Sequence, residues 1–495
     1  MISTKSSKVV LITIGNGINV LINFLTLPYL VRSLSFNDYG SYGQILMIIT
    51  ILQGFFTFNL NQTSNVYFAN DHRDKKVVFS TLMRSAVGMS LIGVLVMYLS
   101  SSCISDIFDN AQIEHLLILS LINMFSQVIT PILISILLFF ERVQYTVIVL
   151  VSTNIFKILM MLMSINYLKS LDVLMFSLSV VSLVQMLAFF VVIPRDVISF
   201  KHFDKSLAKN MFTVASPLAF SSIVEKSLVY LDGFMISAII TTSAYAFYRA
   251  GAVEVPFVAT LYGSVTSIVL PEIAKLFSDG RLNDIVKMKR TAISSTVIFV
   301  YPVLIYFLFF ATPLVSFYLS KNYASSIAVF SIFNLSLLVR VNDYQDVIII
   351  SRNGKFIFKT VCFVSVMNLL LTFTLIKLIG INGGALSFVF SLVLFASILL
   401  YKSTRILRCK ISDLFDFPLI SKVLLISILI CLVISVLYNF IFQSVWLIIF
   451  SAPVYFILVF AFGIRLRLIP ISLFVYISSK IKILKKINYE TRIAG

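Results

Sequence analysis

The sequence predicts an all-α, polytopic membrane protein with about 14 transmembrane helices. Hydrophobic residues make up 59% of its 495 positions and charged residues only 12%, whereas a soluble domain carries about 25% charge. The apolar residues form continuous runs, and about 20 such residues are needed for a helix to cross the hydrocarbon core. The runs lack the alternation of barrel strands, so we expect helices.

The expected spans form two sets of six and a final pair, joined by short connections. The first six are residues 9–31, 41–60, 78–99, 115–140, 145–167 and 171–193. The next six are residues 211–240, 245–270, 292–311, 325–350, 358–379 and 383–400. The final pair is 423–440 and 445–463.

The basic residues indicate how the chain is oriented. Of the 39 Lys and Arg residues, 30 fall in the two tails and in alternate loops on one side of the predicted spans. Four fall on the other side: Arg32, Lys169, Lys321 and Lys377. Positively charged loops stay in the cytoplasm, so we expect both termini in the cytoplasm of a bacterium and the spans in its inner membrane. The net charge of +18 is then a signal of topology, and no nucleic acid is expected as a partner.

The chain is expected to divide into an N-lobe (1–200), a C-lobe (201–411), a C-terminal helix pair (412–463) and a basic cytoplasmic tail (464–495). A faint repeat supports the lobes, because Tyr39-Gly-Ser-Tyr42 and Tyr245-Ala-Phe-Tyr248 fall at matching places in two six-span units. Two such units would face a central cavity. The run 468–479 before the tail lysines fits either a helix on the anionic inner leaflet or a solvated basic tail.

The cysteines and histidines predict neither a disulfide framework nor a metal site. Cys103, Cys362, Cys409 and Cys431 are scattered, with no C-x-x-C pair, and the three histidines lie far apart. No cofactor is expected.

Charged residues inside the predicted spans are the candidate functional residues. Each costs at least about 2.5 kcal/mol at a helix centre, so such residues normally face a protein interior or a wet cavity. The cations would bind an anionic substrate: Arg84, Lys157, Lys226, Arg249 and Arg340. The carboxylates would exchange protons or bind a cation: Glu225, Asp232, Glu254, Asp343 and Asp346. The alternative for each is a contact between helices or a side chain that reaches an interface.

Several short patterns give the chain a family resemblance. They are the first span through Arg32 to Asp38-Tyr39-Gly40, Asp232-Gly-Phe-Met-Ile in the seventh span, and Leu270-Pro-Glu-Ile-Ala274 closing the eighth. In these the chain resembles polysaccharide transporters of the multidrug/oligosaccharidyl-lipid/polysaccharide exporter superfamily, most closely Wzx-type O-antigen flippases.

The resemblance implies a function and a mechanism. The cargo would be undecaprenyl-diphosphate-linked oligosaccharide, flipped by alternating access that a proton or sodium gradient drives. Charged cavity residues would matter, with Arg32 at the outer mouth. The expected partners are the membrane, the cargo, and the polysaccharide polymerase and chain-length regulator of the same system.

Two other functions are considered beside this one. A multidrug or cation antiporter of the same superfamily would share the lobes but usually lacks the final helix pair. A polysaccharide polymerase or ligase would be an enzyme, but such enzymes generally carry a large outward loop, and the outward loops here are short. We therefore expect a transporter.

Overall fold

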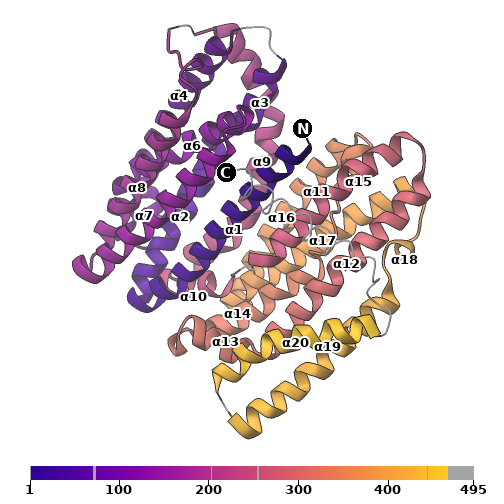
Figure 1. Ribbon diagram of the computed structural model, residues 1–495. Coiled ribbons are helices and arrows are strands. Elements are labelled where there is room, and N and C mark those ends of the chain that lie inside the picture. Colours follow the sequence, from indigo (N-terminus) through magenta and orange to yellow (C-terminus); the bar gives the residue numbers. More distant parts are fainter. Residues whose placement is uncertain (1, 71–73, 202, 254–255, 443, 466–495) are drawn as a thin grey trace, which may run out of the picture. The chain divides into compact units, whose positions relative to one another are not determined.

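A computed structural model describes residues 2–70, 74–201, 203–253, 256–442 and 444–465. Every regular element in this part of the chain is a helix, as the sequence predicts (Figure 1). The chain divides into two compact units. Unit 1 comprises residues 1–256, 318–333 and 358–391, and unit 2 comprises residues 257–317, 334–357 and 392–495.

Unit 1 contains the first ten α-helices and parts of three later ones. They are α1 (Ile2–Ser33), α2 (Phe36–Thr57), α3 (Leu60–Asn70), α4 (Lys75–Ile107), α5 (Gln112–Leu119), α6 (Leu121–Phe139), α7 (Val143–Met163), α8 (Leu171–Val192), α9 (Lys205–Ile239) and α10 (Thr242–Gly251). Most of α14 (Ser325–Asn334), α16 (Gly354–Ile379) and the first part of α17 (Ile381–Leu407) complete it.

Unit 2 contains the remaining helices. They are α11 (Pro256–Ser278), α12 (Leu282–Phe309), α13 (Ala311–Tyr318), α15 (Asp346–Ile350), α18 (Ile411–Leu414), α19 (Phe417–Leu437) and α20 (Val445–Arg465). Short 3-10 turns occupy Leu335–Leu338 in unit 2 and Lys321–Tyr323 in unit 1. A π turn extends α19 of unit 2 over Tyr438–Phe442, and another extends α7 of unit 1 over Ser164–Leu168.

Ten helical segments of the described chain are long and apolar enough to cross a membrane. They are Phe36–Ala69, Lys75–Ile107, Leu121–Phe139, Val143–Leu168, Leu171–Val192, Leu282–Phe309, Gly354–Ile379, Ile381–Leu407, Phe417–Phe440 and Val445–Arg465. Each overlaps one predicted span, so the chain is a multi-pass membrane protein. The predicted total of 14 includes spans in α1, α9 and α11, where many side chains lie outside the described set.

Two predicted spans are not single helices. Span 245–270 divides into α10, which ends at Gly251, and α11, which begins at Pro256. Proline favours the first turn of a helix and disfavours a helical residue before it. Span 325–350 loses its helix over residues 339–345, where the Asp343 carboxylate accepts a hydrogen bond from the Gln345 backbone at 3.0 Å. Such local bonds compete with the helical backbone.

Side chains that accept backbone hydrogen bonds begin several of the helices. Asp74 accepts from Lys76 at the start of α4, Asp204 from Leu207 at α9, and Asp416 from Leu419 at α19. These caps satisfy amide groups that have no partner within the helix.

In unit 1 the helices α2, α4, α6, α7 and α8 pack side by side (Figure 1). Their core includes Phe79 and Leu82 of α4, Ile132 of α6, Phe189 of α8 and Met211 of α9. Since lipid is as apolar as these side chains, close packing and interhelical hydrogen bonds hold the helices together.

In unit 2 the last two long helices, α19 and α20, pack on α12 (Figure 1). Tyr455 of α20 donates a 3.0 Å hydrogen bond to the carbonyl of Pro302 in α12, and Tyr306 of α12 donates to the carbonyl of Ile448. The final helix pair is therefore anchored by polar contacts as well as by packing. The predicted basic tail begins within α20, which ends at Arg465, and the rest of it, including the predicted surface helix 468–479, lies outside the described residues.

Candidate functional site

A close helix contact in unit 1 brings α2 and α10 together through glycines. A methyl group on Gly40 would lie 2.3 Å from the carbonyl oxygen of Thr242, and one on Gly43 would lie 2.6 Å from Cδ of Arg249. Both distances are below van der Waals contact. At Gly40 the neighbour is backbone, so only glycine fits, whereas a methyl group on Gly43 would require the Arg249 side chain to shift. The contact places the two Tyr-x-x-Tyr segments of the sequence against each other.

Arg249 lies at this contact and forms a cationic centre. Its guanidinium donates hydrogen bonds to the carbonyl of Gly43 at 3.3 Å and to the hydroxyl of Tyr245 at 3.4 Å. It also lies 5.9 Å from the ring centroid of Tyr42, within range of a cation–π interaction. No carboxylate of the described residues forms an ion pair with Arg249.

Two lysines extend the positive charge along the bundle. Lys157 of α7 is close enough to Arg249 for their charges to repel. Lys226 of α9 lies close to Gly54, because a methyl group on Gly54 would lie 2.8 Å from Cδ of Lys226. Gly43 and Gly54 are separated by three turns of α2 and share a face, with a rise of about 16 Å between them. One face of α2 therefore contacts two cations, Arg249 of α10 and Lys226 of α9. Within the described residues neither lysine has a carboxylate in an ion pair.

A second centre in unit 1 surrounds the carboxylate of Asp232, which is fully buried. It accepts hydrogen bonds from Thr372 at 2.7 Å, Asn368 at 3.4 Å and Ser387 at 3.4 Å. Asn368 also donates to Ser391 at 3.0 Å. Asn368 and Thr372 are four residues apart on α16, and Ser387 and Ser391 four apart on α17, so each pair lies on one helix face.

This second centre has more acceptors than donors. Oδ2 of Asp232 and Oδ1 of Asn368 are buried and have no hydrogen-bond partner among the described residues, although buried polar atoms are nearly always paired. A proton on the carboxylate would remove the excess. A bound hard monovalent cation would also use the excess acceptors, because hard cations bind carboxylate, amide and hydroxyl oxygens. The described residues contain no cluster of three or more His, Cys, Asp or Glu that would favour a divalent metal.

Helix α10 connects the two centres. The ring of Tyr245 lies 2.8 Å from the position of a methyl group on Gly233, the residue after Asp232. The ring of Tyr248 lies 3.3 Å from the same position on Gly384 of α17. The helix that carries Arg249 thus touches two of the helices that enclose Asp232.

Other predicted cations are not among the residues that form these centres. Arg32 is exposed at the end of α1 and donates to the carbonyl of Leu319 at 3.3 Å. Arg84 is exposed on α4 and donates to the carbonyl of Phe200. Arg340 lines a cavity in unit 2.

The remaining predicted carboxylates are distributed differently. Asp346 forms a buried ion pair with Lys289 at 2.5 Å. The carboxylate of Asp343 accepts from the Gln345 backbone, and its segment is not helical, so its three-residue spacing from Arg340 does not place the two on one helix face. Glu254 and the side chain of Glu225 lie outside the described residues.

Several residues that the structure places at buried polar positions are not among the sequence-based candidates. The predicted topology assigns Lys289 to a cytoplasmic loop, but its side chain is only 3% exposed. Asn368, Thr372, Ser387 and Ser391 carry no charge and so stand out less than the ionisable residues. Their spacing of four within apolar spans is the signal that could identify them.

These features define a class of protein: a multi-pass, all-helical membrane protein with ionisable side chains among its helices, where such residues normally mark a functional pathway. A family model described as "Polysaccharide biosynthesis protein" matches residues 6–277, more than half of the chain. The chain belongs to this polysaccharide biosynthesis family. None of the curated proteins compared with it matches.

Solved structures with the same fold include three transporters. The lipid II flippase MurJ in an inward closed conformation has a TM-score of 0.73 and 17% identity, over 93% of this chain and 99% of that chain. An inward-facing multidrug resistance MATE transporter of the MOP superfamily has a TM-score of 0.57 and 15% identity, over 80% and 94%. The Vibrio cholerae MATE transporter VcmN in its bent form has a TM-score of 0.53 and 14% identity, over 82% of this chain and 98% of that chain. These structures show the fold of the chain, and the resemblance to a polysaccharide family seen in the sequence is confirmed by the family model.

Proposed function

We propose that this protein is a flippase that moves undecaprenyl-diphosphate-linked oligosaccharide repeat units, of O-antigen or a similar surface polysaccharide, from the cytoplasmic to the periplasmic leaflet. The observation that carries the proposal is the cationic centre of Arg249 and Lys157. It occurs in a chain of the polysaccharide biosynthesis family, and the described residues supply it with no carboxylate.

Electrostatics favour an anionic cargo at this centre. Two like charges within a membrane bundle repel each other and lose their hydration, so they are stable only if an anion or water compensates them. A diphosphate supplies that negative charge, and the planar guanidinium of Arg249 can bind two of its oxygens. A cationic drug would be repelled from the same place, which favours a flippase over a multidrug antiporter.

The Asp232 centre supports coupling of this movement to a proton or sodium gradient. Its unpaired acceptors suit either ion, and α10 contacts the helices around it. Binding of the ion at Asp232 would bias the position of α10 and therefore of Arg249. We propose that this link drives alternating access in the inner membrane, with both termini in the cytoplasm and the polymerase and chain-length regulator as partners downstream.

Transport by purified protein in liposomes tests the proposal. Lipid-linked repeat units extracted from cells that lack the corresponding gene serve as cargo, and a membrane-impermeant lectin reports those that reach the outer leaflet. Wild-type protein should flip the cargo, and Arg249→Ala should reduce the rate about tenfold or more, the effect of losing a charged hydrogen bond of about 1.5–3 kcal/mol.

Arg405→Ala is the matched control for this substitution. Arg405 also donates to a tyrosine four residues before it, Tyr401, but at the exposed end of α17. Equal loss in both variants would mean that Arg249 has no particular role. Polymerisation of the repeat units by the purified protein would replace the proposal with the enzyme alternative.

A further inference from the structure

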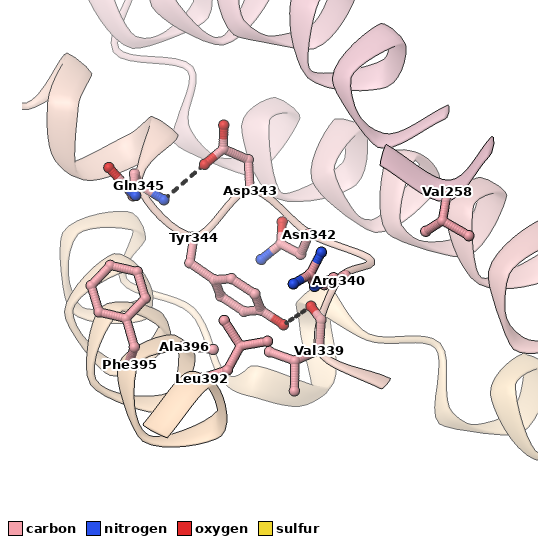
Figure 2. Close-up of a pocket in the computed structure, with 10 residues that line it drawn as sticks. All are labelled: Val258, Val339, Arg340, Asn342, Asp343, Tyr344, Gln345, Leu392, Phe395 and Ala396. Carbon is pink, nitrogen blue, oxygen red and sulfur yellow. Dashed lines mark hydrogen bonds between the residues drawn. The ribbon is translucent and has the colours of Figure 1, made fainter. Parts of the chain in front are cut away.

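Unit 2 contains a cavity of about 260 Å³ where the predicted tenth span is interrupted (Figure 2). The non-helical residues 339–345 form one part of its wall, including Arg340, Asn342, Tyr344 and Gln345. Phe395 and its neighbours in α17 form an apolar part. The cavity belongs entirely to this unit.

The interrupted segment is held in place by its own contacts. Lys289 of α12 donates to the carbonyl of Asp343 at 3.0 Å and pairs with Asp346 at 2.5 Å. The hydroxyl of Tyr344 donates to the carbonyl of Val339 at 2.9 Å, as Figure 2 shows. Tyr301 of α12 donates to the carbonyl of Leu338 at 3.0 Å. The cavity wall is therefore built before any ligand arrives, as binding sites usually are.

The wall combines planar polar groups with aromatic rings. Arg340 offers donors, Asp343 offers acceptors, and the carboxamides of Asn342 and Gln345 offer both. Tyr344 and Phe395 add aromatic surface. A sugar ring presents the matching chemistry, with a rim of hydroxyl groups that donate and accept and two faces of C–H groups that pack on aromatic rings.

The charges of this wall argue against an anion or an acyl chain. The wall contains one cation, Arg340, and one carboxylate, Asp343, and the nearby Lys289 is paired with Asp346, so the charges sum to zero and do not favour a phosphate. An acyl chain would remove water from the polar groups without replacing their hydrogen bonds, which is costly. An uncharged, polyhydroxylated ligand fits both conditions.

We propose that this cavity is a subsite for one uncharged sugar residue of the oligosaccharide, an inference that rests on the proposed flippase function. The volume equals that of about nine water molecules, which is sufficient for one pyranose ring with its hydroxyl groups. The subsite would give the transporter its selectivity among repeat units, because a site built to hydrogen-bond hydroxyl groups rejects ligands that leave its polar groups unpaired.

Binding measurements with two probes test the subsite. The first probe is the lipid-linked repeat unit extracted from the producing cells, and the second is undecaprenyl diphosphate, which carries no sugar. Asn342→Ala and Gln345→Ala should each weaken binding of the first probe roughly fivefold, the effect of one neutral hydrogen bond. They should leave binding of the second probe unchanged.

Two further variants guard against misfolding and nonspecific effects. Phe395→Leu keeps an apolar side chain of similar size but removes the aromatic face, and it should also weaken only the first probe. Asn353→Ala is the matched control, because Asn353 bonds to Ser351 and does not line the cavity; it should bind both probes normally.

The possible results separate the subsite from the proposed function. Weakening of the first probe alone supports the subsite. Equal weakening of both probes by the cavity variants, or no weakening while wild-type protein binds the first probe, overturns the subsite and leaves the flippase proposal standing. Failure of wild-type protein to bind either probe overturns both.

Discussion

The hydroxyl of Thr372 donates a 2.7 Å hydrogen bond to the carboxylate of Asp232, 140 residues earlier in the chain. The bond joins α16 to α9 within unit 1 and occupies one oxygen of the carboxylate, whereas the other oxygen has no hydrogen-bond partner in the part of the chain that the structure describes. Hydrogen bonds thus fix Oδ1 of this carboxylate, and Oδ2 can bind a proton or a cation.

We expect Asp232→Asn to uncouple transport from the ion gradient. The substitution keeps the size of the side chain and removes its charge, so neither a proton nor sodium would bind as before. Flipping in liposomes should fall about tenfold or more, and the remaining rate should not respond to an imposed gradient. Asp172→Asn, at an exposed residue near His115, should behave like wild type. A gradient response that survives in Asp232→Asn would contradict the assignment.

The glycines between α2 and α10 should not tolerate a methyl group. Gly40→Ala places a carbon 2.3 Å from a backbone oxygen, so the helices must separate, at a cost of about 1–3 kcal/mol. Thermal unfolding in detergent should occur at a lower temperature, and transport should fall because Arg249 moves with α10. Gly88→Ala is the control, since no atom of the described residues outside its own helix backbone lies within 4 Å of the added carbon. If the two alanine variants were equally stable, the close contact would have no energetic role.

Removing one partner of the Lys289–Asp346 ion pair should destabilise the protein more than replacing both partners with apolar residues. Lys289→Met or Asp346→Leu alone leaves one buried charge without its partner, and we expect a loss of about 3–5 kcal/mol. The double variant should recover much of this stability. Unfolding measurements on all four proteins give the coupling between the two residues, and additive losses would show that the pair acts as two independent charges.

Native cysteines can test the predicted orientation. Cys103 is exposed at the end of α4 and Cys409 follows α17, on opposite sides of the membrane in the predicted topology. A membrane-impermeant maleimide should label Cys103 in spheroplasts and Cys409 only in inverted vesicles, with Cys103→Ser and Cys409→Ser as controls. Labelling of both cysteines from the same side would show that the predicted side of the membrane is wrong for one of them.

The same experiment has an expected pH dependence. Burial, with a smaller contribution from the charge of Asp413, raises the pKa of the Cys409 thiol. A raised pKa leaves less thiolate at neutral pH, and thiolate is the reactive form. Labelling of Cys409 should therefore be slow at about pH 7 and become faster as the pH rises through the thiol's raised pKa. A rate that stops rising at or below pH 9.0, the ordinary pKa of the thiol, would contradict the shift.

The charged residues within the spans show what a local sequence pattern predicts and what it does not. Asp232 and Arg249 are predicted as functional residues because an ionisable group within an apolar run is costly unless it faces a protein interior or a wet cavity. Arg84 meets the same criterion, yet it lies exposed on α4 and bonds to a loop carbonyl. The direction in which a helix faces is set by its neighbours, and the local sequence does not specify it.

By itself the sequence determined the all-helical membrane class, the positions of most long helices and the candidate charges, because all of these follow from the polarity of consecutive residues in lipid. Only the tertiary structure decided that Arg249 lies against Gly43, that Asp232 lies among Thr372, Asn368 and Ser387, and that residues 339–345 leave the helix around a cavity. These relationships join residues that are distant along the chain or replace one backbone hydrogen bond with another. They depend on which helices pack together, and the hydropathy of the sequence does not specify which helices these are.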